Sequence, residues 1–279
     1  MPIHDQGYRR YAGRREPHGR SWWVIARAGL QERLGERRFL ALLLLAWAPF
    51  LVRGVQIYVA SNYPQASFLA PGAGTFREFL DQQSIFVFFV TIYVGAGLIA
   101  NDRRANALQL YLSKPLTRVE YITGKLVTLV VFLVGVTWAP AMFLLLLQMM
   151  FAGDTSFVRG NLFLIPAITL FSALQVVVAA VTMLALSSLS KSRRFVSLMY
   201  AGIVFFTGAM HQALRGITGS SAWAFVSPED TFDVIADAVF RIPGRAAMPV
   251  PAAFAAVAVL IAASIWILER RVRAVEVVT

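Results

Sequence analysis

The sequence predicts an all-α membrane protein with six transmembrane helices. Of its 279 residues, 58% are hydrophobic and only 15% are charged, a composition typical of polytopic membrane proteins. Six apolar runs are each long enough to cross a bilayer as a helix. Basic residues gather in the segments between alternate runs, which gives the predicted spans a defined orientation. These three observations together exclude an ordinary soluble domain.

We expect three parts along the chain. Residues 1–20 form a basic cytosolic tail, residues 21–38 an interfacial amphipathic helix, and residues 39–279 a single six-span transmembrane domain. The predicted spans are about 39–60, 84–100, 126–150, 162–189, 196–214 and 249–268. Because mostly polar residues precede the first run, we expect that run itself, rather than a cleavable signal peptide, to direct insertion.

The distribution of Lys and Arg predicts the orientation. Twenty of the 26 lie in four segments: nine before Phe39, five in residues 101–125, three in residues 191–194 and three in residues 270–273. By the positive-inside rule these segments and both termini are cytoplasmic, in a plasma or inner cell membrane. Anionic lipid headgroups account for the net charge of +11, so no nucleic acid is implied.

Composition also predicts that the chain holds no cofactor or metal of its own. There are no cysteines, and the three histidines, His4, His18 and His211, are widely separated. No phosphate-binding loop occurs, because Val119 precedes Gly124-Lys125 at the position where a glycine is needed. We therefore expect no enzyme in this chain; a membrane enzyme with a dispersed site is a weaker alternative.

The segment from Ser21 to Arg38 has a helical pattern. Ser21 is placed to cap it, and its polar positions include Arg27, Glu32, Arg33 and Arg37. The expected apolar stripe consists of Trp22, Trp23, Ala26, Leu30 and Leu34. Tryptophans opposite a basic face indicate a helix in the membrane interface, serving either as an anchor or in signalling.

Arg53 is unusual in the first span because fourteen uncharged residues precede it. A charge there costs roughly 2.5–3.5 kcal/mol on insertion scales, so it needs water, a partner or an escape route. Snorkelling to the outer surface and facing a polar cavity or acid are equally weighted alternatives. In the following outer loop, 62–83, Glu78 and Asp81 are candidate counter-charges.

A polar island, Asn101 to Lys125, separates the second and third spans. Ala107, Leu108, Tyr111 and Leu112 recur at helical spacing before Pro115 ends the turn. Thr117 and Glu120 then have the spacing of a capping box at the start of the next helix. The pattern predicts a docking elbow fixed to a transmembrane helix, although a loop whose charges merely set topology is the alternative.

Residues 110–125, LYLSKPLTRVEYITGK, resemble the cytosolic coupling segment of ABC-2 type transporter permeases. That segment reads as leucines, then S-x-P-[VL]-[ST]-R-x-E-[YF], then G-K. This chain departs from it upstream, with Arg104 and Asn106 where the family often has an acid and a glycine. The coupling residues that we identify from the island and its resemblance are Leu108, Tyr111, Leu112, Pro115, Arg118, Glu120 and Tyr121.

The resemblance implies the membrane subunit of an ATP-driven transporter. Its partners would be a cytosolic ABC ATPase dimer, which binds ATP and Mg, and a second permease subunit that is identical or homologous. Export of a lipid, drug or other small molecule is the first interpretation. The alternative is a mechanotransmitter that serves an extracytoplasmic partner, for example in metal-cofactor assembly.

Other residues within the spans suggest packing or a transport path. Gly95 and Gly97 permit close approach of helices, and Pro140 predicts a kink. Gln175 and His211, together with Arg53, are the candidates for a translocation path. A buried hydrogen bond between helices is the more common role for the first two.

The segment from Arg215 to Met248 predicts a short outer helix between spans five and six. Ser227 followed by Pro228 is typical of a helix start. Phe232, Ile235, Val239 and, less closely, Ala236 share one side, and Asp230, Asp233 and Asp237 share another. We expect a solvated acidic face; the alternative is contact with a cation or a basic outer partner.

Overall fold

A computed structural model describes residues 21–63, 65, 72–107, 117–151, 160–244 and 247–272, and in these ranges it contains helices and no strands. The basic tail and the segment 108–116 of the polar island lie outside them. The elements are α1 Ser21–Leu34, α2 Arg37–Ala46, α3 Ala48–Asn62, α4 Ala73–Val90, the π-helix η2 Thr91–Gly95, α5 Ala100–Arg104, α7 Arg118–Val136, α8 Trp138–Phe151, α10 Leu164–Leu189, α11 Arg193–Thr218, the 3₁₀-helix η3 Ser221–Val226, α12 Pro228–Val239 and α13 Val250–Arg271.

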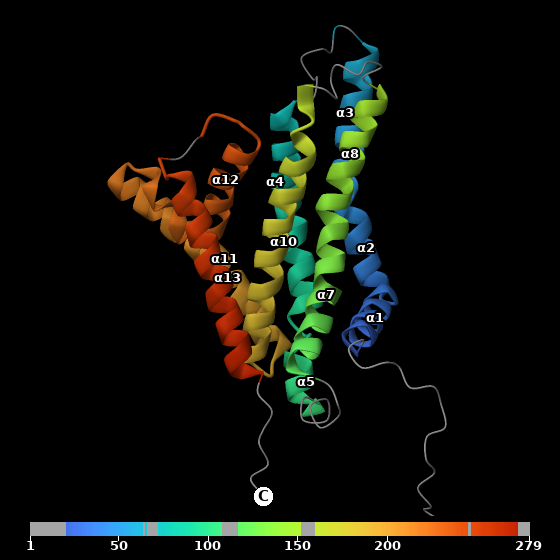
Figure 1. The fold of residues 1–279 in the computed structure, drawn as a ribbon, viewed down its shortest axis with the longest axis vertical. Coiled ribbons are helices and arrows are strands. Elements are labelled where there is room, and N and C mark those ends of the chain that lie inside the picture. The colour runs from blue at the N-terminus through green and yellow to red at the C-terminus, as the bar shows by residue number, and fades with distance from the viewer. Residues whose placement is uncertain are drawn as a thin grey trace, which may run out of the picture.

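Six helical units in the described residues are long and apolar enough to cross a membrane. They are Arg37–Asn62, Ala73–Arg104, Arg118–Phe151, Leu164–Leu189, Arg193–Thr218 and Val250–Arg271. Each span expected from the sequence lies inside one of these units or within two residues of it, so the six-span prediction is confirmed. Figure 1 shows α4 and α10 in the middle, α3 and α8 on one side, and α11, α12 and α13 on the other.

The two ends of the bundle differ in charge. One end carries α1, α5 and the last turn of α13 (Figure 1) and is called the basic end from here on. Its cations include Arg38, Arg103, Arg104, Lys125, Arg193, Arg194, Arg270 and Arg271. The opposite end, which carries α12, is called the acidic end, and its acids are Glu78, Asp81, Glu229, Asp230, Asp233 and Asp237.

Two of the spans are broken into helix pairs. The first changes from α2 to α3 at Trp47, and Pro49 lies in the first turn of α3. The third changes from α7 to α8 at Thr137, three residues before Pro140. Because a proline removes a backbone donor and its ring clashes one turn upstream, the expected kink appears before the proline and not at it.

The second span starts eleven residues earlier than the sequence suggested. Residues expected in the outer loop form the first turns of α4, and Phe76, Phe79, Leu80 and Gln83 are buried along one stripe of it. Their i, i+3, i+4, i+7 spacing is a helical signal. The polar residues between them, including Arg77, lower the local hydropathy. A prediction based on continuous apolar runs therefore missed this part of the helix.

The same span loses regular α-helical geometry where it approaches the basic end. Thr91 to Gly95 form a π-helix, and the following turn precedes α5. A Cβ on Gly95 would lie 2.4 Å from the Met183 side chain, so glycine is required for the close approach of η2 to α10. Short π-helical segments are local irregularities where a helix can bend.

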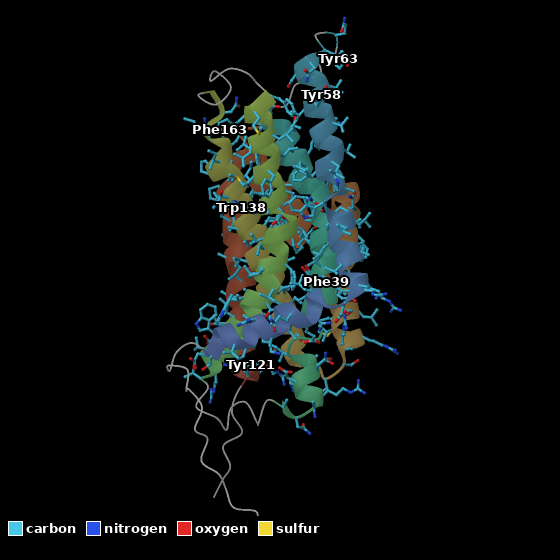
Figure 2. The ribbon with its side chains drawn as sticks, turned by 90° about the vertical axis from the view of Figure 1, so that its right-hand side faces the viewer. Phe39, Tyr58, Tyr63, Tyr121, Trp138 and Phe163 are labelled. Carbon is cyan, nitrogen blue, oxygen red and sulfur yellow. The ribbon has the colours of Figure 1, made fainter. Side chains whose placement is uncertain are left out.

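Helix α1 lies across the bundle near its basic end, roughly perpendicular to the spans (Figure 2). It packs on α7, where Thr128 donates a hydrogen bond to the Ala26 carbonyl over 3.4 Å, and where Gly124 closely faces Ile25. Within the expected stripe Ala26 is buried, whereas Trp23 and Leu34 are exposed; among the polar positions Arg33 is buried. Arg33 is buried because it pairs with Glu36 at 2.6 Å in the turn between α1 and α2.

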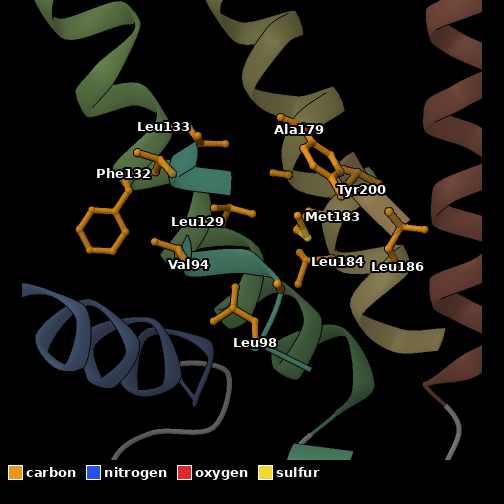
Figure 3. Close-up of a cluster of buried hydrophobic side chains, with 14 of the residues drawn as sticks. Val94, Leu98, Leu129, Phe132, Leu133, Ala179, Met183, Leu184, Leu186 and Tyr200 are labelled. Atoms are coloured by element: carbon orange, nitrogen blue, oxygen red, sulfur yellow. The ribbon is translucent and has the colours of Figure 1, made fainter. Parts of the chain in front are cut away.

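The buried apolar side chains form two clusters, one toward each end. The cluster nearer the basic end joins η2, α7, α10 and α11, and Figure 3 shows Val94, Leu129, Met183 and Tyr200 converging from these elements. The second joins α4, α8, α10, α12 and α13 around residues such as Phe79. Helix α10 contributes to both, so it connects the two ends through one continuous core.

Candidate functional site

The docking elbow is described only at its two edges. Leu108, Tyr111, Leu112 and Pro115 lie outside the described residues, so the predicted contact stripe stays a prediction. At the downstream edge, Glu120 N–H donates to Thr117 Oγ1 over 3.2 Å, and Thr117 N–H donates to Glu120 Oε2 over 2.9 Å. The capping box expected from the sequence is thereby confirmed, and it fixes where α7 begins.

The two edges of the elbow are joined by one carboxylate. Asp102, on α5, accepts a hydrogen bond from the Tyr121 hydroxyl at 2.7 Å and pairs with Lys125 Nζ at 2.7 Å. Tyr121 is fully buried, so it positions the elbow and does not offer a contact surface. Arg118 is exposed beside it. A force on the elbow would therefore act on α5 and α7 together.

Contacts from α5 continue into α10. Ser187 Oγ accepts hydrogen bonds from the N–H groups of Ile99 and Ala100 at 3.1 and 3.0 Å and donates to the Ala96 carbonyl at 3.0 Å. Arg103 donates to the Ser188 carbonyl. Where the second span is irregular, backbone N–H and C=O groups that are not paired within the span thus form hydrogen bonds with α10. This fixes the elbow to the central helix of the bundle.

A second set of contacts joins the turn between α1 and α2 to η2 and α11. The Tyr93 hydroxyl donates to Glu36 Oε2 over 2.7 Å, while Arg193 donates to the Tyr93 carbonyl over 2.8 Å and lies over its ring. The hydrogen bond from Tyr93, with the nearby charge of Arg33, holds the pKa of Glu36 below its ordinary value. The basic end is therefore cross-linked by polar contacts between most of its helices.

At the acidic end, α12 has the start that the sequence predicted. Ser227 caps it, with the Asp230 N–H donating to its hydroxyl over 3.3 Å, and Pro228 is the first helical residue. The apolar side packs inward, where Ile235 is fully buried and Phe232 meets Phe171 of α10 edge to face. The expected amphipathic helix exists, but it lies between other helices.

The expectation of a solvated acidic face on α12 is only partly met, since the Asp233 side chain is 48% exposed but that of Asp237 is buried. Arg77 of α4, which the sequence reasoning did not single out, donates to Asp237 at 3.1 Å and to Asp233 at 2.7 Å, and lies 3.6 Å from Asp81. The side chains of Arg77 and Asp237 are both only 3% exposed. Because a buried cation requires partners, the acids of α12 serve as an internal counter-charge for α4.

The third acid of this face is also used inside the protein. His211 Nδ1 of α11 lies 2.8 Å from Asp230 Oδ2, and the imidazole is buried. Nearby, burial raises the pKa of Asp233 to about 6; Arg77 opposes this rise, and the carboxylates of Asp81, Asp237 and Asp230 add to it. Helix α12 is thus joined to α4 by charged groups, and its Asp230 lies beside the buried imidazole of α11.

Arg53 has an acid as its partner. Its guanidinium donates to Glu78 of α4 over 3.2 Å and to Gln56 over 3.3 Å. Of the two alternatives from the sequence, this arrangement corresponds to the acid, with Glu78 as the counter-charge. Glu78 is 55% exposed, so the pair lies at the rim of the bundle.

A cavity of about 350 Å³ lies between α4, α10, α11 and α12. Its wall is mainly apolar and includes the aromatic rings of Phe88, Phe89, Phe171, Tyr200, Phe205 and Phe232, so it is called the aromatic cavity from here on. Gln175 lines it, whereas His211 lines a separate cavity of about 140 Å³ and Arg53 lines neither. The three residues proposed for a translocation path are therefore not brought together in this conformation.

The residues that sequence reasoning missed have identifiable signals. Arg77 is the one basic residue of the expected outer loop 62–83, and it follows buried Phe76 in the apolar stripe of α4. Asp102 is one of two acids in an island that has five basic residues. A charged residue whose sign is opposite to that of most charges in its segment indicates a specific partner. Which residue that partner is depends on the tertiary contacts.

The comparisons with known proteins gave one family match. The profile of a family described as ABC-2 family transporter protein matches residues 23–271, which is nearly all of the described chain. No curated protein matches the sequence.

Proposed function

The chain belongs to the ABC-2 family of transporter membrane proteins, and on that premise we propose that it is the permease subunit of an ATP-driven exporter. It works as a dimer of permease subunits with a pair of cytosolic ABC ATPases, which bind ATP and Mg. The basic end faces the cytoplasm, in accordance with the positive-inside rule. The extent of the family match, from the α1 helix to the end of α13, is the observation that carries the proposal.

In this proposal the ATPases act on the elbow. The exposed Arg118 and the predicted stripe of Leu108, Tyr111 and Leu112 form a helix-in-groove contact with a cleft on the ATPase. Movement of the elbow reaches α7 through Lys125 and α5 through Asp102, because these two are paired at 2.7 Å.

The hydrogen bonds to Ser187 then carry the displacement into α10, whose core contacts extend to the acidic end. The π-helix in the second span is the place where that span bends, since its backbone is already irregular there. The walls of the aromatic cavity belong to α4, α10, α11 and α12, so relative motion of these helices opens or closes it.

A mechanotransmitter that serves an outer partner is the alternative of different class. Its support from the sequence was the acidic face of Asp230, Asp233 and Asp237. These acids contact Arg77 and His211 within the chain. That internal use supports the exporter over the alternative.

The elbow gives the sharpest test. We expect Leu112→Asp and Leu108→Asp to leave a folded, inserted subunit that no longer retains its ATPase or stimulates ATP turnover, because each places a charge in a desolvated contact. The matched control is Asn106→Asp, which adds the same charge at an exposed position. Asn106 has a φ of 52°, and aspartate tolerates that conformation.

The measurements are co-purification of the ATPase and ATP hydrolysis by the complex in lipid. Full retention of the ATPase and full stimulated turnover in the Leu112→Asp subunit, at normal yield, would reduce the elbow to a charged loop and contradict the proposed coupling.

A further inference from the structure

The aromatic cavity has a polar end and an apolar end. Asp81, Glu229 and Asp233 lie at the polar end, where α4 meets α12. Phe88, Tyr200 and Phe205 cluster at the other, with the Phe88 ring 5.7 Å from Tyr200 and 5.5 Å from Phe205. Along α4 the seven residues from Asp81 to Phe88 correspond to about 10 Å. A ligand that fills the cavity therefore needs one charged or polar end and one apolar end.

The polar end has an excess of negative charge in a chain that is strongly basic as a whole. In the described residues around it, carboxylates outnumber basic groups. The carboxylates are those of Asp81, Glu229, Asp230, Asp233 and Asp237, and the basic groups are the guanidiniums of Arg77 and Arg215 and the imidazole of His211. Within the part of the chain that the structure describes, Glu229 has no ion pair. A cation is thus the complementary head group.

A second observation, independent of the acids, indicates a ligand. Gln175 of α10 is only 8% exposed and lines the cavity, and its Oε1 has no hydrogen-bond partner in the described residues. An unsatisfied buried acceptor costs about 1–3 kcal/mol, so such groups normally have a partner. A ligand with an N–H or O–H group on its body would supply one.

The lining of the cavity reaches the exposed apolar surface of the bundle. Ile85, Phe89 and Phe205 line it and are among the exposed large hydrophobic residues. An apolar body can therefore lie in the cavity at membrane depth while its head remains beside the acids. The required ligand is an amphiphile.

We propose that this cavity binds amphiphilic amines: a protonated amine head beside Glu229 and Asp81, a hydrogen-bond donor against Gln175, and an aromatic or alkyl body among the phenylalanines. The binding of such amines does not depend on the proposed function. The statement that they are the exported substrate rests on it. The amine has two possible sources, the bilayer and water, and the test separates them.

The probe is dansylcadaverine, a fluorescent primary amine whose sulfonamide N–H lies next to an aromatic body. The full chain is placed in phosphatidylcholine nanodiscs at pH 7.5, with empty discs as the blank. N-pentyl dansylamide, which has the same body and no amine, is the matched neutral ligand. We expect the amine to bind about fivefold more tightly than the neutral ligand, the upper range for one partly exposed charge pair.

Three variants test the parts of the site. Glu229→Gln should weaken binding of the amine about fivefold and leave the neutral ligand unchanged, while Glu269→Gln, the same change near the basic end, should alter neither. Gln175→Leu should weaken both ligands by about two- to tenfold, because both contain the sulfonamide N–H. Ser84→Phe, which fills the cavity, should abolish binding of both.

Equal affinity for the amine and the neutral ligand, or equal effects of Glu229→Gln and Glu269→Gln, would overturn the proposal. Displacement of the probe by octadecylamine in the disc supports it and assigns the bilayer as the source; displacement by water-soluble phenylpropylamine supports it with an aqueous source. Displacement by neither overturns it.

The outcome is separable from that of the proposed function. The binding test needs no ATPase, and Leu112→Asp should bind the probe as the unaltered chain does. A chain that binds the amine but never stimulates an ATPase contradicts only the proposed function. One that couples to the ATPase but does not bind the amine contradicts only this inference.

Discussion

Replacing Arg77 by methionine tests whether a buried charge holds α12 to α4. The change keeps the unbranched apolar part of the side chain and removes the guanidinium, which leaves Asp237 without that partner in a site where its side chain is 3% exposed. Removing one partner of a buried pair destabilises by about 3–5 kcal/mol. Asp233 and Asp81 are 48% and 51% exposed, so their loss of the same partner adds little.

The assay is reversible unfolding of the purified chain in mixed detergent micelles, followed by circular dichroism. Arg53→Met is the matched control, because Arg53 also pairs with a carboxylate at the acidic end, but Glu78 is 55% exposed. We expect a loss of under about 1 kcal/mol there. The double variant Arg77→Met with Asp237→Leu should recover much of the loss, since removing both members of a buried pair is often nearly neutral.

Two results would refute this reasoning. An Arg77→Met chain as stable as Arg53→Met would mean that the guanidinium does not hold α12 in place. Additive effects in the double variant would mean that Arg77 and Asp237 do not interact directly, because contacting residues show coupling energies of about 0.5–3 kcal/mol.

Three further predictions concern single positions. Thr117→Val removes the side-chain acceptor at the start of α7 and should lower the unfolding free energy by about 0.5–2 kcal/mol, measured as above; an unchanged value would mean that the cap contributes nothing. Gly95→Ala forces a Cβ toward Met183 and should cost about 1–3 kcal/mol, whereas Gly135→Ala, with open space around it, should not destabilise; equal effects would contradict the close approach. Asp233 has its pKa raised to about 6 from an ordinary 3.8, so its contribution to stability is fully present below pH 4 and is lost as the pH rises through 6. Asp233→Asn should therefore reduce the change in thermal stability between pH 5 and pH 7, and an unaltered pH dependence would show that another group dominates.

Local pattern determined much of this protein before any tertiary contact was considered. Hydropathy predicted the six spans to within a few residues at most ends, because a helix in lipid must satisfy its own backbone and cover it with apolar side chains. The caps at Thr117 and Ser227 were equally readable, since each depends on residues three or four positions apart. The early start of α4 was missed because polar residues interrupt its stripe.

The partners of the charged residues were decided by the tertiary structure alone. Asp230, Asp233 and Asp237 form an acidic face on any helical projection, and nothing local distinguishes a solvated face from one packed on a cation. Arg77 lies 160 residues from Asp237 in sequence. Only the packing of α12 against α4 and α11 brings these groups together and removes water from around Arg77 and Asp237. It is this desolvation, not the pattern, that turns Asp237 into an internal partner.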